Sequence, residues 1–331
     1  MTTNTMKAIV ATGYGSPSVF QLQNVNQPTL KPNEILVKIK NTTVTQADAM
    51  MRTGKPYIGR LMLGLFKPKN QIWGTSFSGV VEAVGAEVSS FKPGQRVFGE
   101  NVESFGAYAE YITVPADGTV MLLPENISFE DASGIGDGPV TSLNFLRNVS
   151  GGIKPGQKVL INGASGALGT AAVQLAKQFG AEVTGVCSTR NIGLVKSLGA
   201  DHVFDYTKHD FTQSGKTYDV IYDTVGKRSF KDCKRVLAKN GQYLSPVLDL
   251  GLLFQMIWTS AFTSQKAKFA ATGMLKSPEI KEMLAEIIDI IREGRLKTII
   301  DRQYPLEKVS EAHTYVSAGH KKGNVVIAVQ S

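Results

Sequence analysis

The sequence predicts an α/β protein with two parts, an antiparallel, barrel-like β domain followed by a doubly wound parallel sheet. Three observations support this prediction. The chain has 331 residues, of which 42% are hydrophobic, and that length suggests about two domains. Short apolar or alternating segments bounded by Gly, Pro and Asn dominate residues 6–124, as in strands joined by turns. Apolar strands and helical segments alternate over residues 158–273, which is the pattern of a parallel sheet.

The first part is expected to consist of strands with a single helix among them. Each expected strand is short and is bounded by turn-forming residues. The strands are expected at residues 7–11, 20–25, 35–39, 80–84, 96–98 and 108–114, and the helix at residues 44–52.

The second part is expected to alternate strands and helices, with glycine as a favoured residue after a helix. The strands are expected at residues 159–161, 182–187, 202–206, 219–223 and 242–245, and the helices at 170–179, 192–198 and 230–239. After Gly273 we expect a helix at 278–293, a strand at 298–303, a helix at 306–317 and a strand at 324–329. This tail is expected to pack back onto the first part and close a cleft between the lobes. The expected domains are residues 1–125, 126–272 and the returning segment 273–331.

Composition narrows the function classes. The only cysteines are Cys187 and Cys233, so we expect neither a disulfide framework nor a Cys-rich metal site, and a reducing cytoplasm is the simplest location. The formal net charge is +8, but no block of five Lys or Arg occurs, which favours a basic enzyme with a polyanionic cofactor over a nucleic-acid-binding protein. No apolar run reaches the roughly 18–20 residues of a membrane span, and residues 1–5 lack the pattern of a signal peptide.

The most informative motif is a glycine-rich turn between an apolar strand and a helix. Its six residues are Ala164-Ser165-Gly166-Ala167-Leu168-Gly169. In this context Gly166 lets the backbone approach a pyrophosphate, and Gly169 lets the helix pack against the strand. The free N–H groups at the start of the helix then face the phosphates. We therefore expect these six residues to bind a nicotinamide dinucleotide, although Ala164 replaces the first glycine of the fingerprint.

The end of the following strand bears on the choice of cofactor. An enzyme that uses NAD is expected to carry an acid there, which bonds the ribose hydroxyls. Here the strand is followed by Ser188-Thr189-Arg190 without a carboxylate. These residues can bind a 2′-phosphate, whereas a carboxylate would repel it. The sequence therefore favours NADPH (NADP), with a solvated Arg190 as the alternative interpretation.

A catalytic zinc ion is not expected. Such a site needs three protein ligands, usually His, Cys or a carboxylate. The first Cys of the chain is Cys187 and the first His is His202, so the predicted β domain has neither. The later histidines His209, His313 and His320 show no metal-ligand spacing.

Together with these motifs, several segments resemble the medium-chain dehydrogenase/reductase superfamily, and more narrowly its zinc-free quinone oxidoreductase branch. They are residues 7–8, 74–85, 91–99, 106–111, 171–177, 198–201 and 218–226, so the resemblance covers nearly the whole chain. It implies a GroES-like β-barrel catalytic domain and a Rossmann cofactor domain. It also implies hydride transfer to a quinone or an α,β-unsaturated carbonyl compound, and a homodimer formed through the edges of the cofactor sheets.

Departures from the family pattern bear on the catalytic residues. Zinc relatives carry a Cys where this chain has Thr45, and quinone reductases often carry Asn-Pro-Val-Asp at residues 45–48, of which only Asp48 matches. By analogy, Thr45, Asp48 and Tyr57 are the catalytic candidates, because an anionic product needs hydrogen-bond donors when zinc is absent. Two alternatives stay open. Thr45 can cap the following helix together with Asp48, and Tyr57 can be an ordinary surface aromatic residue.

The resemblance implies further cofactor contacts, because ligands bind beyond the carboxyl ends of parallel strands. A helix beneath the nicotinamide is expected to begin at Thr141, and adenine is expected near Tyr206. The remaining expected contacts are Val225, Gly226, Leu244, Ser245 and Asn324.

Some interpretations remain open. The chain can instead reduce aldehydes or ketones with NADPH, or it can be a weak catalyst that binds NADPH as a structural ligand and, given its basic charge, RNA. The apolar segment 247–262 can be core, a wall of the substrate pocket, or a dimer or membrane-surface contact.

Overall fold

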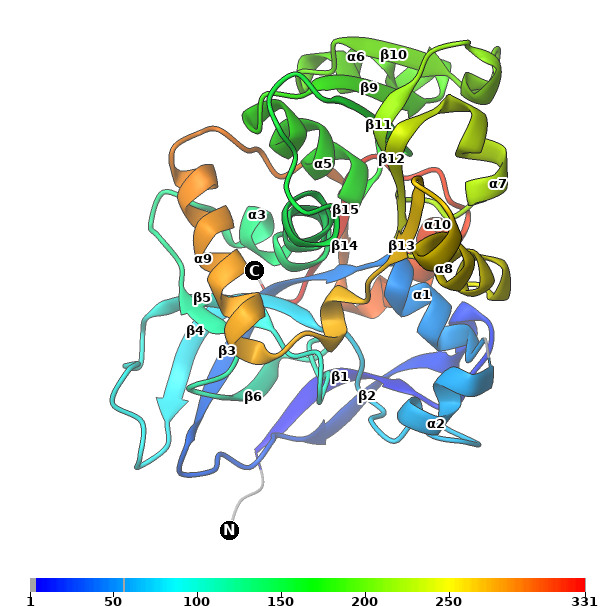
Figure 1. Ribbon diagram of the computed structural model, residues 1–331. Coiled ribbons are helices and arrows are strands. Elements are labelled where there is room, and N and C mark those ends of the chain that lie inside the picture. The colour runs from blue at the N-terminus through cyan, green and yellow to red at the C-terminus, as the bar shows by residue number, and fades with distance from the viewer. Residues whose placement is uncertain (1–3, 56, 331) are drawn as a thin grey trace. The chain divides into compact units, whose positions relative to one another are not determined.

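The computed structural model describes residues 4–55 and 57–330. These residues form two compact units (Figure 1). Unit 1 contains the described residues up to Asp137 together with Lys276–Arg292 and the residues from Thr298 onward. Unit 2 contains Gly138–Leu275 and Glu293–Lys297. Domain boundaries were expected after residues 125 and 272, and the chain passes from one unit to the other after Asp137 and after Leu275.

Unit 1 is built on β-strands. β1 (Thr5–Ala11) and β2 (Phe20–Asn26) form an antiparallel pair. A seven-stranded sheet has the order β14-β15-β3-β4-β5-β7, with β6 paired to β3, and only β14 and β15 run parallel. Its strands are β3 (Glu34–Val44), β4 (Ser76–Val84), β5 (Arg96–Glu100), β6 (Tyr111–Pro115), β7 (Val120–Leu122), β14 (Ile300–Pro305) and β15 (Asn324–Ala328). The helices are α1 (Gln46–Thr53), α2 (Arg60–Leu63), α3 (Phe129–Ser133), α9 (Ser277–Arg292) and α10 (Val309–Ser317).

Alternating residues of β3 form the main core of unit 1. Ile35, Val37 and Ile39 are all fully buried and pack with Phe77 and Val97, as expected for a strand with one face toward a core. A second cluster joins α10 to the sheet through residues such as Val309, Ala312, Val316 and Val325, and it includes Tyr108. This second cluster fixes α10 beside β3 and α1, where Thr45 and Asp48 lie.

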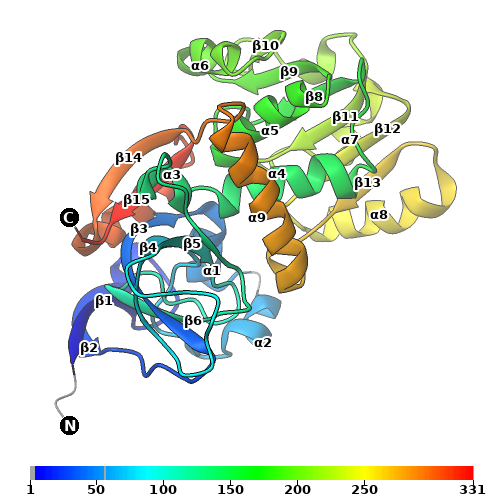
Figure 2. The same ribbon diagram turned by 90° about the vertical axis from the view of Figure 1, so that its left-hand side faces the viewer.

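Unit 2 is a six-stranded parallel sheet in the order β10-β9-β8-β11-β12-β13 (Figure 2). Its strands are β8 (Lys158–Asn162), β9 (Glu182–Cys187), β10 (His202–Asp205), β11 (Tyr218–Asp223), β12 (Leu237–Ser245) and β13 (Lys266–Phe269). The helices are α4 (Thr141–Leu143), α5 (Ala167–Gln178), α6 (Ile192–Ser197), α7 (Phe230–Cys233) and α8 (Leu250–Phe262). The strand order reverses between β8 and β11, which is where a doubly wound sheet binds ligands.

The structure corrects part of the predicted element list. The helix expected at residues 230–239 ends at Cys233, and β12 begins at Leu237. Leu237 is buried and pairs with Tyr218 of β11, so sheet pairing overrides the local helical pattern. Gly241 therefore lies inside a strand instead of ending a helix. The short strands β7 and β13 were not predicted, because three or four residues carry too little periodicity.

Candidate functional site

The turn after β8 is held in shape by Gly163. This residue has a φ of 81°, a conformation that residues with a side chain rarely adopt. A Cβ atom on Gly163 would lie 2.4 Å from Cγ2 of Val225, in the turn after β11. The Gly163 and Ala164 N–H groups both donate to the Val186 carbonyl, at 3.1 and 3.0 Å. Gly163, one residue before the expected fingerprint, therefore supplies the tight turn, and this explains why Ala164 is tolerated at the first fingerprint position.

Three small residues follow in this turn, Ala164, Gly166 and Gly169, and each is small for a different reason. A Cβ on Gly169 would lie 2.1 Å from the Gly163 carbonyl oxygen, so α5 can approach β8 only with glycine there. The Ala164 methyl faces Gly185 of β9, where a Cβ would come within 3.0 Å of it. A Cβ on Gly166, by contrast, would meet only the Gly163 oxygen, at 3.5 Å. The space beside Gly166 is not filled by the described residues of the chain, which fits the approach of a pyrophosphate from outside.

The start of α5 offers backbone donors to such an anion. The helix begins at Ala167, and no side chain caps it at Gly166. The first N–H groups of a helix have no partner within the helix, and together with the helix dipole they favour a bound phosphate. The neighbouring Ser165 is 8% exposed, and its hydroxyl accepts a hydrogen bond from Asn191 Nδ2 at 2.9 Å. Asn191 Oδ1 is buried with no hydrogen-bond partner among the described residues.

The turn after β11 lies on the other side of the point where the strand order reverses. Its shape depends on Asp223, a fully buried carboxylate. The N–H groups of Val225 and Gly226 both donate to Asp223 Oδ1 at 3.1 Å, and Asn162 Nδ2 donates to the same oxygen at 2.8 Å. Sequence reasoning named Val225 and Gly226 but missed the role of Asp223. The expected contacts Leu244 and Ser245 are both buried at the end of the adjacent β12.

The segment after β9 contains a carboxylate neighbour that sequence reasoning missed. Ser188 ends the extended backbone, and Thr189 and Arg190 are exposed. The Thr189 hydroxyl donates to Asp205, the last residue of the adjacent β10, and lies 3.1 Å from the Thr207 hydroxyl. Hydrogen bonds from Thr189 and Thr207 hold the pKa of Asp205 below its usual value. A negative charge therefore lies beside the residues expected to bind a 2′-phosphate.

Three other expected cofactor residues lie in different settings. Tyr206 follows β10 and is 54% exposed. Thr141 is the first residue of α4 but not the start of a helix as expected, because helical backbone already runs from Gly136 and continues to Val149. The next residue, Ser142, donates its hydroxyl to the Leu168 carbonyl at 2.8 Å, which places α4 beside the start of α5. Asn324 belongs to unit 1, where it begins β15 and donates Nδ2 to the Ile299 carbonyl at 3.2 Å.

In unit 1, Thr45 and Asp48 form a capping box at the start of α1. Thr45 Oγ1 accepts the Asp48 N–H at 3.0 Å, and Asp48 Oδ2 accepts both the N–H and the hydroxyl of Thr45 at 2.9 Å. Both residues are buried, at 6% and 1% exposure. This is the capping arrangement that the sequence allowed as an alternative to a catalytic role. The Thr45 hydroxyl already uses its proton within the protein.

Tyr108 and His313 extend this capping box into a buried network. The Tyr108 hydroxyl donates to Asp48 Oδ2 at 3.2 Å and lies 3.2 Å from His313 Nε2. Burial raises the pKa of Asp48 to about 6 and, with the charge of Arg52, lowers that of His313 to about 3. A neutral His313 can therefore donate its Nε2 proton to the phenol oxygen. Sequence reasoning missed both Tyr108 and His313, because 205 positions separate them.

A second buried acid in unit 1 is Glu100, the last residue of β5. The Ser76 hydroxyl donates to its carboxyl group, and a Cβ on Gly136 would overlap that same group. Burial raises the pKa of Glu100 to about 8, an effect that Asp137 and Asp48 reinforce. Glu100 is therefore protonated at neutral pH. Sequence reasoning missed it, because a single Glu at the end of a strand carries no signal.

Tyr57 lies on the surface of unit 1. Its side chain is 65% exposed, and the Arg60 guanidinium lies 4.9 Å above its ring. The exposed phenol contrasts with the buried hydroxyl of Thr45.

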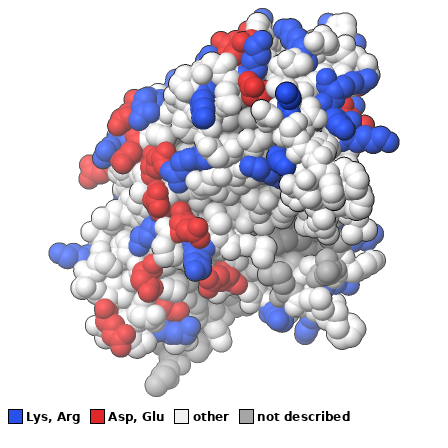
Figure 3. Space-filling model, in the orientation of Figure 1, with Lys and Arg blue, Asp and Glu red and all other residues white. Residues whose placement is uncertain are grey.

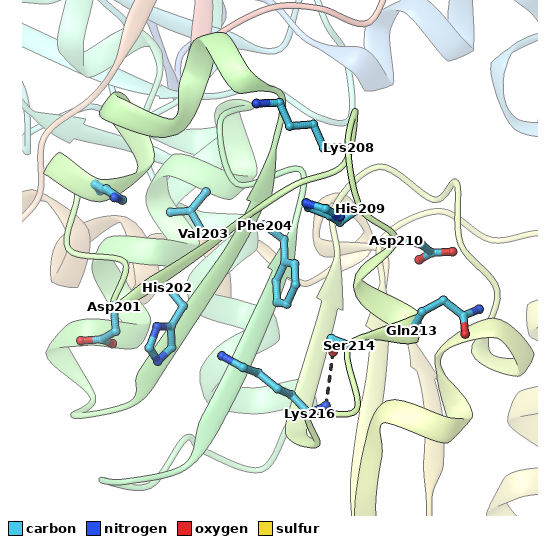
Figure 4. Close-up of a pocket in the computed structure, with 11 residues that line it drawn as sticks. Asp201, His202, Val203, Phe204, Lys208, His209, Asp210, Gln213, Ser214 and Lys216 are labelled. Atoms are coloured by element: carbon cyan, nitrogen blue, oxygen red, sulfur yellow. Dashed lines mark hydrogen bonds between the residues drawn. The ribbon is translucent and has the colours of Figure 1, made fainter.

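The described residues contain no group of three or more His, Cys, Asp or Glu side chains that could hold a metal ion. The described residues do form a depression along β10, and His202, Phe204 and Lys216 are among the residues that line it (Figure 4). Its two acids are paired, Asp201 with Lys177 at 2.8 Å and Asp210 with Arg228 at 3.3 Å. None of the expected cofactor residues lines it, so it is separate from the turn after β8.

Comparison with known proteins gives the family. Residues 31–125 match the alcohol dehydrogenase GroES-like domain, and residues 198–327 match a family described as zinc-binding dehydrogenase. A 2-methylene-furan-3-one reductase of Solanum lycopersicum is 32% identical over 97% of this chain and 79% of its own length. A chloroplastic quinone oxidoreductase of Triphysaria versicolor is 32% identical over 97% of this chain and 98% of its own. The structure of Escherichia coli quinone oxidoreductase complexed with NADPH has a TM-score of 0.82 and 25% identity, over 98% of this chain and all of that one.

The chain belongs to the quinone oxidoreductase-like branch of the medium-chain dehydrogenase/reductase superfamily. The predicted fold, a GroES-like domain with a Rossmann domain, is confirmed. The prediction of an oxidoreductase is confirmed as well.

Proposed function

We propose that this oxidoreductase uses NADPH to reduce a quinone or an α,β-unsaturated carbonyl compound, and that it does so without a zinc ion. The observation that carries the proposal is the turn from Gly163 to Gly169. It combines unfilled space beside Gly166 with uncapped N–H groups at the start of α5. Both features suit a pyrophosphate.

A preference for NADPH over NADH is supported by the positive charge and the hydroxyl groups that follow β9. Arg190 and the hydroxyls of Ser188 and Thr189 follow β9, and Arg is well suited to bind a phosphate. The similar E. coli quinone oxidoreductase has a structure with NADPH bound. Asp205 opposes this preference, because an ionised carboxylate beside Thr189 repels a 2′-phosphate. We propose that Arg190 outweighs Asp205.

When bound, NADPH supplies the hydride. The chain must then stabilise negative charge on the substrate oxygen, and hydrogen-bond donors do this. Tyr57 has an exposed phenol that can donate. Thr45 can donate only if its O–H turns away from Asp48, which now accepts it at 2.9 Å. We therefore rank Tyr57 above Thr45 as the donor, and we assign Asp48 to the positioning of Thr45.

Zinc independence is supported by the ligand inventory of the sequence. The first 186 residues contain neither Cys nor His. Of the later histidines, His313 is fully buried and faces Tyr108. Metal analysis of the purified protein is expected to find far less than one zinc per chain, and stoichiometric zinc would contradict this part of the proposal.

The substrate class is supported by the relatives. Their names describe reduction of a methylene-substituted furanone and of quinones. Both kinds of compound accept hydride at a carbon conjugated with a carbonyl group.

We further propose a homodimer in the cytoplasm. β13 pairs with β12, and its other edge is unpaired among the described residues; such an edge can pair with another chain. Light scattering coupled to gel filtration is expected to give twice the mass of the chain, and a monomer at micromolar concentration would contradict the dimer.

Turnover is the direct test. The decay of NADPH absorbance is measured with a naphthoquinone, an alkenal and a simple ketone. We expect turnover with the first two and little with the ketone. Tight NADPH binding without turnover of any of them would contradict the proposed reaction and favour a binding protein. Preference for the ketone would instead favour a carbonyl reductase.

A further inference from the structure

α8 exposes a more apolar face than the one it buries. Among its 13 residues none is charged. The buried side chains are only Leu252 and Thr259, with Met256 packed against the core of unit 2. The Thr259 hydroxyl oxygen accepts a hydrogen bond from the Ala267 N–H of β13, at 3.0 Å. The helix is thus anchored by a partly polar face.

The opposite face consists of large apolar side chains. Those that are exposed are Leu250 (86%), Leu253 (43%), Phe254 (67%), Ile257 (66%), Trp258 (52%) and Phe262 (70%). Residues three, four or eight positions apart lie on one side of a helix, so Leu250, Phe254, Trp258 and Phe262 make a continuous stripe. The rings of Trp258 and Phe262 lie 4.7 Å apart. Of the interpretations left open for residues 247–262, core packing therefore applies to the buried face of α8 and not to this one.

Area alone does not decide between a second copy of this chain and a lipid surface as the cover of this face. Its six exposed side chains are on average about two-thirds exposed and together present several hundred Å², whereas a stable protein interface buries about 800 Å² on each partner. A single apolar helix face is also sufficient to lie in the interface of a lipid bilayer, where Trp, Phe and Leu side chains enter the acyl boundary. The charges that border the helix favour the lipid surface.

Basic residues border one end of α8. Ser264 and Gln265 follow the helix, and their side chains donate to the carbonyls of Lys239 and Lys234, at 2.5 and 3.2 Å. Lys231, Lys234, Arg235 and Lys239 are all exposed. The acids nearby are Asp232, which belongs to the capping box of α7, Asp249, which caps α8, and Asp210, which pairs with Arg228 and also lies near Arg235. Figure 3 shows the uncharged surface of the α8 region beside the Lys and Arg of the α7 region. A basic border beside an apolar stripe suits an anionic lipid surface.

We propose that α8 docks this protein on membranes that contain anionic lipids, with the stripe from Leu250 to Phe262 in the acyl boundary and Lys231 and Lys234 near the headgroups. The helix lies in the plane of the surface. Among the residues described, no helix combines the length and apolarity that crossing a bilayer demands, so the attachment is peripheral. This inference does not depend on the proposed reaction.

The chain contains a built-in reporter for the test. Its only two tryptophans are Trp73 and Trp258, and Trp73 is 3% exposed in the core of unit 1. Insertion of Trp258 is therefore expected to shift the fluorescence of the protein to shorter wavelength. Full-length protein is titrated with phosphatidylcholine vesicles and with vesicles in which one third of the lipid is phosphatidylglycerol, and binding is also measured by flotation.

We expect binding and a blue shift with the anionic vesicles, and at least about tenfold weaker binding for F254S/I257S, because about two large apolar side chains then leave the acyl boundary. The variant K231E/K234E is expected to lose the preference for anionic lipid. The matched control F66S removes an 88% exposed Phe of unit 1 and is expected to bind as the unchanged protein does. Circular dichroism and NADPH titration verify that each variant is folded.

Three results would overturn the proposal. The first is no binding to either kind of vesicle, or equal binding to both. The second is unchanged binding by the folded F254S/I257S variant. The third is a dimer that dissociates when F254S/I257S is introduced, without vesicle binding by either protein, since a second copy would then cover the stripe.

Discussion

The glycine-rich turn of unit 2 and the buried acid network of unit 1 are built on opposite principles. The shape of the turn is set by backbone geometry, and Gly163, Gly166 and Gly169 lie within seven consecutive residues. The network is formed by side-chain hydrogen bonds, and Asp48, Tyr108 and His313 come from distant parts of the chain. A site made of local backbone can be recognised in a sequence, whereas a site made of distant side chains becomes visible only after folding.

The largest expected effect separates two glycines of the same turn. In G169V the new side chain would overlap the Gly163 carbonyl region, where even a Cβ comes within 2.1 Å. Overpacking of this kind, against backbone, is expected to destabilise the fold by about 3 kcal/mol or more. G166A places its methyl in open space, so it is expected to keep the melting temperature while weakening NADPH binding at least about tenfold. Thermal unfolding and NADPH fluorescence titration measure the two effects, and equal loss of stability in both variants would contradict the distinction.

The next effect concerns the pH dependence of stability. The pKa of Glu100 is raised from 4.5 to about 8, so the folded state keeps a proton that the unfolded chain loses above about pH 4.5. This contribution to the free energy of unfolding is fully present below pH 4.5 and is lost as the pH rises through about 8. E100Q is neutral throughout, so its decline in stability between pH 5 and pH 8 is expected to be smaller, by on the order of 3 kcal/mol.

Urea denaturation at the two pH values tests this. Asp48, with a pKa raised to about 6, and Asp137 are present in both proteins, so the difference between the two profiles reports Glu100 together with its interaction with these two acids. Identical pH profiles for E100Q and the unchanged protein would contradict a protonated Glu100.

A smaller effect separates the two tyrosines of unit 1. Y108F removes the hydroxyl that Asp48 and His313 share, and leaving buried polar groups without a partner costs about 1–3 kcal/mol. Y57F removes an exposed phenol and is expected to leave stability within about 0.5 kcal/mol. If Tyr57 is the donor, kcat falls in Y57F without a change in melting temperature. Unchanged kcat in Y57F would remove Tyr57 from the proposed site.

The smallest expected effect concerns the coenzyme phosphate. R190A is expected to raise the KM for NADPH about tenfold, which corresponds to the loss of one charge-assisted hydrogen bond, and to leave the KM for NADH unchanged. D205N is expected to act in the opposite direction. Equal changes with both coenzymes in R190A would show that Arg190 does not contact the 2′-phosphate.

These contrasts explain how far the sequence could be read. The parallel sheet and the turn were predictable, because alternating periodicity and glycine positions are local. The end of the helix at Cys233 was not, since pairing of Leu237 with Tyr218 is a tertiary effect. The roles of Asp223 and Glu100 could not be predicted either. In the sequence, a single acid at the end of a strand has the same pattern whether its carboxylate caps a turn or it lies protonated in a core. The apolar segment that became α8 shows the same limit, since its composition does not tell which face is covered.

The most direct test of the proposed function is steady-state turnover of chelator-treated protein, with zinc quantified in the same sample. We expect rapid oxidation of NADPH by a naphthoquinone, at least about tenfold greater kcat/KM than with NADH, and no gain in rate when zinc is added back. Activity that disappears with the chelator and returns with zinc, or equal use of NADH, would contradict the account.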